Sequence, residues 1–243
     1  MLGQLMSTEY SNAGELMGLN GSEFDSDLMG YLANLNPVAR AKAIQKITKS
    51  PVSSQGSRAE FEKFFSELPQ HIKDGLLNGK LRLADHTIYT IKPVNGSKTI
   101  KMFESQDVKE VGLRNISNAK LPKNMAMLVS GIILLSAVPA SAGVPTKDEV
   151  MSAAYGAIEA QGALHSGEFT FKANKKHLLS DTSLNKFKTD GFSHVRKGYY
   201  KLANPRLIQD DVDIDFDIEL GTVTGLDVKT HLFLGLHGTV TIP

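Results

Sequence analysis

The clearest alternation of polar and apolar side chains runs from residue 210 to residue 220, where carboxylates alternate with Val, Ile, Phe and Leu. Successive side chains of a strand point to opposite faces, so this period of two predicts a β-strand with one apolar and one acidic face. Neighbouring carboxylates on that face lie about 7 Å apart, twice the rise per residue, and repel one another unless water, a cation or a basic surface screens them. We therefore expect the acidic face to be a contact surface, formed by Asp211, Asp213, Asp215, Asp217 and Glu219.

Most other segments after residue 80 also have β-type patterns. Asn95-Gly96 lies between two apolar runs and predicts a hairpin turn, with residues 99–103 as the returning strand. Further strands are expected over residues 108–116, 125–138, 168–172, 192–202 and 206–242. No repeat of fixed period is visible, which argues against a propeller or a solenoid. Eight or nine strands in this length predict a mainly β fold, either a single jelly roll or a Greek-key sandwich.

Helical patterns are expected at the front of the chain and in connections. Asn36-Pro37 predicts the start of a short basic amphipathic helix. A second helix is expected over residues 58–68, with a continuation to residue 77 after Pro69. Thr146 to Glu149 has the pattern of a capping box and predicts a helix that runs to about residue 164. Residues 174–190 are expected to contain one more helix.

These patterns divide the chain into three parts. Residues 1–57 form an N-terminal arm with the basic helix, residues 58–79 a helical segment, and residues 80–243 a β-sandwich domain. The first 36 residues contain five acids and no Lys or Arg, and they are rich in Gly, Asn, Ser and Met, so we expect an arm that is ordered only by contact. The basic helix is predicted to contact lipid or nucleic acid, or else to pack on its own domain with solvated charges; those charges are Arg40, Lys42, Lys46 and Lys49.

Composition narrows the class of protein. With 243 residues and 41% apolar residues the chain can bury a proper core. It has no Cys, which excludes disulfides and thiolate metal sites and fits a reducing compartment. No secretory signal is expected, and the apolar run of residues 125–140 is too short and too interrupted to span a bilayer as a helix.

Charge is distributed in blocks near the C-terminus. Residues 166–209 contain nine Lys or Arg and three acids, whereas residues 210–243 contain one Lys and seven acids. Two explanations are open. Neighbouring strands of opposite charge can pair within one chain, or the acidic strand of one subunit can pair with the basic surface of another. Arg196, Lys197 and Lys201 are the basic residues expected at such an interface between subunits.

The sequence contains no recognisable reaction centre. Four alternate acids match the first ligands of an EF-hand loop, but Phe216 and Thr222 stand where Gly and Glu are required. A looser cation site and a solvated, salt-bridged strand face remain the alternatives. The paired histidines of cupin metal sites, the Gly-x-Ser-x-Gly elbow and the phosphate-binding Gly-rich motifs are missing. We expect no enzymatic activity, no cofactor, no metal and no small-molecule substrate.

An arm, a basic amphipathic helix and an all-β domain with oppositely charged faces form a plan that resembles viral coat proteins of the jelly-roll type, in particular those of tailless bacteriophages. The resemblance is architectural and covers the whole chain in outline. It implies a capsid subunit of the virion, assembled in the host cytoplasm from copies of itself and other virion proteins. It also implies that the arm contacts the genome or internal lipid.

A calcium-dependent carbohydrate-binding β-sandwich is the alternative. The absence of Trp argues against it, because sugar-binding platforms favour large aromatic faces. A β-fold enzyme is a third hypothesis, which requires a concave pocket with convergent titratable groups.

Overall fold

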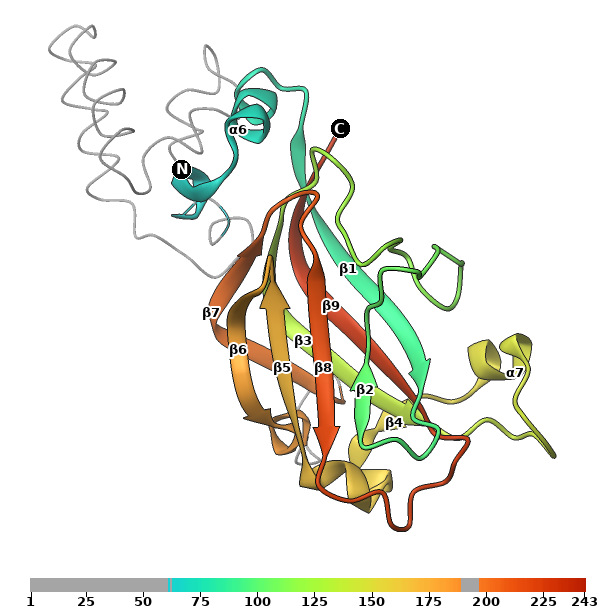
Figure 1. The fold of residues 1–243 in the computed structure, drawn as a ribbon. Coiled ribbons are helices and arrows are strands. Elements are labelled where there is room, and N and C mark those ends of the chain that lie inside the picture. The colour runs from blue at the N-terminus through green and yellow to red at the C-terminus, as the bar shows by residue number, and fades with distance from the viewer. Residues whose placement is uncertain (1–60, 62, 189–196) are drawn as a thin grey trace, which may run out of the picture. The chain divides into compact units, whose positions relative to one another are not determined.

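The computed structural model describes residues 61, 63–188 and 197–243, and it divides the chain into two compact units (Figure 1). The described residues up to 85, with residues 123–128 and 239–243, belong to the first unit, and the described residues within 86–122 and 129–238 belong to the second. The predicted arm, residues 1–57, lies outside the described residues. None of the described helices is both long and apolar enough to span a membrane.

The described helices of the first unit are short. A 3-10 turn η1 (Phe65–Glu67) is followed by helix α6 (Gln70–Leu77), with Pro69 at the N-cap position. The predicted continuation of the helix beyond Pro69 is therefore confirmed. Ile72 and Leu76 are buried, one turn apart on the same side of the helix.

Nine strands are present among the described residues, arranged in two antiparallel sheets (Figure 1). One sheet has five strands in the order β1-β9-β3-β4, with β7 also paired to β3, and the other has four in the order β2-β8-β5-β6. The strands are β1 (Arg82–Pro93), β2 (Thr99–Lys101), β3 (Met127–Ala137), β4 (Gly156–Ala157), β5 (Gly167–Ala173), β6 (Lys176–Ser183), β7 (Tyr199–Ile208), β8 (Ile214–Leu220) and β9 (His231–Ile242).

The strand order identifies the type of sandwich. When the two-residue β4 is left aside, β1 pairs with β9, β2 with β8, β3 with β7 and β5 with β6. The first half of the β-domain thus pairs with the second half in reverse order, as if one long hairpin had been rolled up into two sheets. This is the arrangement of a jelly roll, a double-sheet fold of eight strands. The predicted mainly β fold with a jelly-roll or Greek-key sandwich is confirmed.

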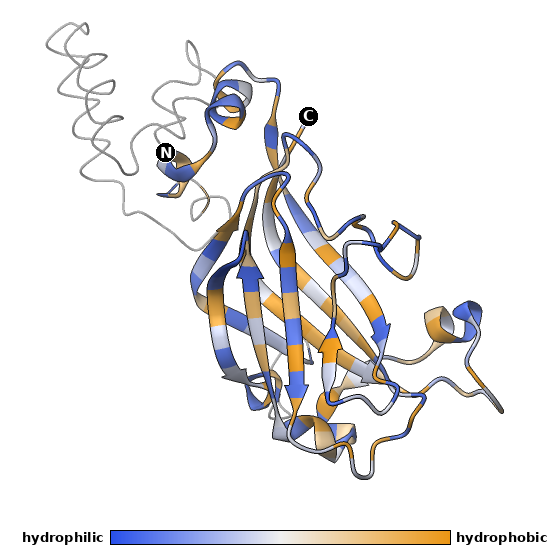
Figure 2. Cartoon of the chain, viewed as in Figure 1, coloured by the Kyte–Doolittle hydropathy of each residue, from blue (hydrophilic) through white to orange (hydrophobic). Residues whose placement is uncertain are grey.

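Aromatic side chains fill the buried face of the four-stranded sheet. The rings of Phe169 and Phe216 stack with their centroids 5.0 Å apart, and Phe171 and Phe187 contact this pair. All four are at most 1% exposed. Figure 2 shows the alternation that produces this arrangement, because hydrophobic and hydrophilic residues alternate along β8. A period of two places successive side chains on opposite faces, so one face of the strand can be buried while the other is solvated.

The predicted Asn95-Gly96 turn is present, but it does not make a two-stranded hairpin. Both residues have positive φ, 50° and 67°, as a tight turn requires. However, β1 pairs with β9 and β2 pairs with β8, so the turn carries the chain from one sheet to the other. The expectation that residues 99–103 return alongside the preceding strand is wrong.

The strand predicted over residues 108–116 is also wrong. Residues 104–122 form an irregular segment with isolated bridges, and Val108 and Val111 are exposed. This segment bonds to strands of both sheets, since the Ile91 N–H donates to the Leu113 carbonyl (2.9 Å) and the Ile214 N–H to that of Ala119 (2.8 Å). It therefore lies beside the edge strand β1 and beside the start of β8, which the short β2 does not reach, and it satisfies backbone groups there that would otherwise be unpaired.

The helix predicted from Thr146 to residue 164 is much shorter. The capping box is present, yet α7 (Lys147–Ser152) ends after six residues and is followed by β4 and two 3-10 turns, η2 (Ile158–Ala160) and η3 (Gly162–Ser166). The helix expected within residues 174–190 is limited, in the described part of that stretch, to the 3-10 turn η4 (Leu184–Phe187), which follows β6. Asn174 and Lys175, with φ of 50° and 62°, form a tight turn that returns the chain into β6.

Two of the later predicted strands differ at their ends. The strand expected over residues 192–202 begins at Tyr199 in the described part and continues to Ile208 as β7. The β-region expected from residue 206 onward is interrupted by a turn before β8 and by a loop over residues 221–230.

Candidate functional site

The acidic stretch is only partly a strand. β8 begins at Ile214, and Asp211, with φ of 55°, lies in the turn before it. Asp213 forms an isolated bridge with Lys120. Asp215, Asp217 and Glu219 alternate with buried side chains of β8 and lie on its more exposed face. The prediction is thus right for the strand from residue 214 and wrong for residues 210–212.

Lysines of the same chain flank these carboxylates. β8 lies between β2 and β5, where Lys101 is opposite Asp217 and Lys172 is opposite Asp215. The Lys172 Nζ lies 3.8 Å from a carboxylate oxygen of Asp217. Lys120 approaches Asp211 at 3.8 Å and Asp213 at 3.5 Å. Pairing within one chain, the first of the two explanations for the charge blocks, therefore occurs, and two of the three lysines come from outside the basic block.

These ion pairs are loose. Asp213 is 54% exposed and its partner Lys120 is 39% exposed. Solvated pairs of this kind contribute roughly 0–1 kcal/mol each to stability and are screened by salt. A partner surface that presents cations can therefore compete for the same carboxylates at little energetic cost.

An excess of negative charge remains around β8. Glu219 lies directly opposite Glu168 in the β5–β8 ladder, and both are exposed. Like charges directly opposite one another in a sheet are destabilising. The carboxylates in this region outnumber the neighbouring lysines; they are Glu168, Asp211, Asp213, Asp215, Asp217 and Glu219, against Lys101, Lys120 and Lys172.

The described basic candidates lie in the other sheet. Lys197 is exposed in the turn before β7, and Lys201 is exposed on β7, which pairs with β3 and not with β8. Neither makes an ion pair with another residue of the described ranges. Arg196 falls outside the described residues, as do the four cations of the predicted basic helix, Arg40, Lys42, Lys46 and Lys49.

Histidines and carboxylates do not gather into a metal site in the part of the chain that is described, since no group of three or more lies close enough to hold an ion. His237 contacts the Thr87 hydroxyl at 2.9 Å and the edge of the Tyr199 ring. Burial lowers the pKa of His86 from 6.5, and the positive charge of Lys109 lowers it further. Burial raises the pKa of Tyr155 to about 12, so its hydroxyl stays protonated.

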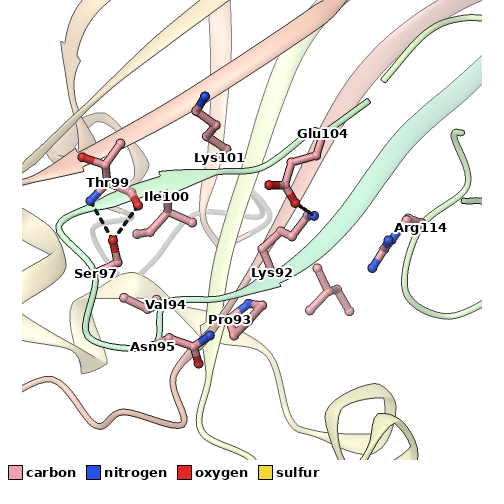
Figure 3. Close-up of a pocket in the computed structure, with 11 residues that line it drawn as sticks. Lys92, Pro93, Val94, Asn95, Ser97, Thr99, Ile100, Lys101, Glu104 and Arg114 are labelled. Atoms are coloured by element: carbon pink, nitrogen blue, oxygen red, sulfur yellow. Dashed lines mark hydrogen bonds and ion pairs between the residues drawn. The ribbon is translucent and has the colours of Figure 1, made fainter. Parts of the chain in front are cut away.

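Sequence reasoning missed a polar hollow at the turn between β1 and β2 (Figure 3). Its volume is about 380 Å³, and it is lined by the end of β1, the turn over residues 94–98, β2, Glu104 and Arg114. Ser97 closes the turn, since its Oγ donates to the Thr99 carbonyl and accepts the Thr99 N–H. Every residue of the lining belongs to the second compact unit.

Four charged residues form a network beside this hollow. The Lys92 Nζ donates to Asp107 Oδ1 at 2.8 Å and forms an ion pair with Glu104. Arg114 Nη1 donates to the same Asp107 oxygen at 2.6 Å, and the Glu104 N–H donates to Oδ2 at 3.1 Å. The side chains of Lys92 and Asp107 are only 11% and 7% exposed. Such a buried network is stable only when each charge is paired, because an isolated buried charge is strongly destabilising.

One sequence signal could have revealed the hollow. Positions 88, 90, 92 and 94 share one face of β1 by alternation, and all four residues are buried. Three of them are Ile88, Thr90 and Val94, whereas the remaining one is Lys92. A lysine at a core position requires a buried carboxylate partner, and Asp107, fifteen residues further on, provides it.

Comparison of the chain with protein-family models, with curated proteins and with solved structures gave no significant match. The grounds for a functional assignment are therefore the jelly-roll strand order, the charged surfaces and the polar hollow.

Proposed function

We propose that this chain is a virion structural protein, a capsid subunit that forms a shell with copies of itself and other virion proteins. The observation that supports the proposal most is the jelly-roll strand order, a fold that is common among viral capsid subunits. Lectins and cupins share this fold, so the fold alone does not select a function. The surfaces of the molecule favour assembly over the alternatives.

Charge complementarity between copies is the first surface argument. The excess carboxylates surround β8 in the four-stranded sheet, whereas Lys197 and Lys201 lie at the start of β7 in the five-stranded sheet. Lys197 and Lys201 lack a carboxylate partner among the described residues. A second copy can present these lysines to the acidic strand of the first, and such contacts set the register and orientation of subunits more than their raw affinity.

Exposed apolar side chains are the second surface argument. Six large apolar residues of the described part are exposed, and all lie in segments that connect strands: Val108, Val111, Val138, Val144, Met151 and Val228. These segments are tied together, because Lys147 pairs with Glu110 at 2.7 Å and the Lys229 ammonium donates to the Ser141 carbonyl. Exposed apolar side chains on connecting segments are available for contacts between subunits, and a shell subunit needs more than one contact surface.

The size of the full chain in solution tests this proposal. Sedimentation velocity and electron microscopy of the purified protein should detect large assemblies that become smaller as salt is raised from ~50 mM to ~500 mM, because salt screens the charged contacts. A chain that stays monomeric at high concentration in low salt would contradict the proposal. A small oligomer whose melting temperature rises with calcium would instead favour the carbohydrate-binding alternative.

The proposal assigns the N-terminal arm to the interior of the virion. Arg40, Lys42, Lys46 and Lys49 would then contact the genome or internal lipid, since both present phosphates to a basic helix. Deletion of residues 1–57 should leave the circular dichroism spectrum of the β-domain intact and remove binding to single-stranded DNA or to anionic vesicles. Unchanged binding of the truncated chain to DNA or vesicles would show that the arm does not make this contact.

A further inference from the structure

The hollow between β1 and β2 carries an inference that does not depend on assembly. Its volume of about 380 Å³ falls within the range of small-ligand sites, roughly 300–1,000 Å³. Figure 3 shows the paired ends of Lys92 and Glu104 together in the space between β1 and β2. Lys101 also belongs to the lining, but its side chain points away from this pair.

Hydrogen-bond donors exceed acceptors around the hollow. Both oxygens of Asp107 are occupied, since Oδ1 accepts from Lys92 and from Arg114 and Oδ2 accepts from the Glu104 N–H. An ammonium group has three protons, and those of Lys92 have two acceptors, Asp107 and Glu104. The Nε–H of Arg114 is buried and has no acceptor at all. A buried donor without an acceptor is destabilising, so a ligand with oxygen acceptors would satisfy it.

The kind of donor points to the same class of ligand. Lys92 and Arg114 line the hollow, and the side chain of Lys101 points away from them. The carboxylates of Glu104 and Asp107 balance these two cations in charge but leave N–H donors without acceptors. A guanidinium and an ammonium in one concave site form strong charge-assisted hydrogen bonds with planar or tetrahedral oxyanions.

We propose that this hollow binds a small free oxyanion through spare N–H donors of Lys92 and Arg114. The ligand carries a carboxylate or a phosphate group, and Glu104, which is 36% exposed, competes with it for the Lys92 ammonium. Binding would supply an acceptor for the Arg114 Nε–H. The network of Lys92, Asp107 and Arg114 holds these donors in place before the ligand arrives.

The test is calorimetric titration of the full chain with sodium phosphate and, separately, with sodium acetate, each at the same ionic strength as a sodium chloride reference. Thermal melting followed by circular dichroism gives a second reading. Phosphate or acetate should bind and raise the melting temperature above that in chloride. The tighter of the two identifies the group that the site prefers. If neither anion bound or raised the melting temperature above that of the chloride reference, the proposal would be overturned.

Two variants should change the affinity in opposite directions. Glu104→Gln removes the competing negative charge and should raise anion affinity roughly three- to tenfold. Arg114→Lys keeps the positive charge and a donor to Asp107 but lacks the planar fork, so it should lower the affinity about tenfold. Because Glu104 is partly exposed, its variant remains informative even if the Arg114 variant does not fold.

Lys176→Gln is the matched control, since Lys176 is exposed on β6 and does not line the hollow. This change of one charge should alter the affinity by less than about twofold, because water and salt screen it. A loss of affinity for Lys176→Gln with none for Arg114→Lys would show that the anion responds only to net charge. A lower affinity for Glu104→Gln would contradict the proposal.

Discussion

The outer faces of the two sheets differ in what covers them. In the four-stranded sheet, the outer face of β8 carries Asp215, Asp217 and Glu219 and is solvated. In the five-stranded sheet, Phe233 alternates with the buried Leu232 and Leu234 of β9, and its ring stacks on Tyr89 of β1 at 5.9 Å. Residues 104–122 and α7 cover this second face, where a small apolar cluster forms from Ile91, Leu113, Val150, Tyr155 and Phe233.

This difference explains why strands of the four-stranded sheet are easier to predict from the sequence. A strand with one solvated face must alternate, as β8 and β5 do with burial patterns that switch at nearly every residue. β3 and most of β9 are buried on both faces and read as continuous apolar runs. The four-stranded sheet therefore packs against the central core alone. The five-stranded sheet also packs against a second, smaller apolar cluster on its outer face.

The largest effect is expected from the central core. Phe216→Ala removes a fully buried ring that stacks on Phe169, and it should lower the free energy of unfolding by about 3–5 kcal/mol. Urea denaturation followed by circular dichroism measures the change. Phe216→Leu, which leaves a smaller cavity, should lower the free energy of unfolding clearly less than Phe216→Ala does. A loss below about 1 kcal/mol for the alanine variant would mean that β8 does not pack as described.

The second core sharpens the comparison between the two faces. Phe233→Ala should lower the free energy of unfolding by about 2 kcal/mol, less than Phe216→Ala, because the Phe233 ring is only partly buried. Asp217→Asn on the solvated face of β8 is the contrasting change and should alter it by less than about 1 kcal/mol. If Phe233→Ala and Asp217→Asn lowered the free energy of unfolding equally in urea, the outer faces of the two sheets would not differ in their contribution to stability.

The smallest effect is a pH dependence at β1. Burial lowers the pKa of His86 in the folded state, so the unfolded chain binds a proton more readily. The contribution is therefore constant above the unfolded pKa, and stability is lost as pH falls through about 6.5 toward the lower folded pKa. Urea midpoints at pH ~7.5 and pH ~5.5 should differ less for His86→Gln than for the natural chain. If the urea midpoints of the two proteins changed equally with pH, His86 would not contribute to the pH dependence of stability.

Much of the fold could be predicted because local patterns determine it. The acidic alternation locates β8 from Ile214, and Asn95-Gly96 locates a tight turn. Turn chemistry fixes backbone angles but not the sheet that the next strand joins, so the crossing of β2 to β8 was not predictable. Residues 108–116 have a β-type pattern, but isolated bridges, single backbone hydrogen bonds to β1 and side-chain hydrogen bonds hold them in place instead of a continuous ladder.

The candidate surfaces were predictable to a lesser degree. Charge blocks indicated that the acidic stretch meets cations, but Lys101 and Lys120, which flank it, lie outside the basic block. Long-range pairing of this kind depends on strand order, which composition does not contain. The position of Lys92 on the apolar face of β1 indicates a buried carboxylate partner, but only the tertiary fold shows that Asp107 and Arg114 are the residues beside it.

The central claim is that the acidic strand is a contact between copies of this chain, and sedimentation velocity of two matched variants tests it most directly. Asp213→Asn, Asp215→Asn and Asp217→Asn together remove three charges from β8 and the residue before it. Asp74→Asn, Asp148→Asn and Asp227→Asn remove the same number from exposed positions outside the four-stranded sheet. Both proteins should keep the natural circular dichroism spectrum. We predict that only the first loses its large assemblies at low salt. Assemblies that survive in the first variant, or dissolve equally in both, would contradict the claim.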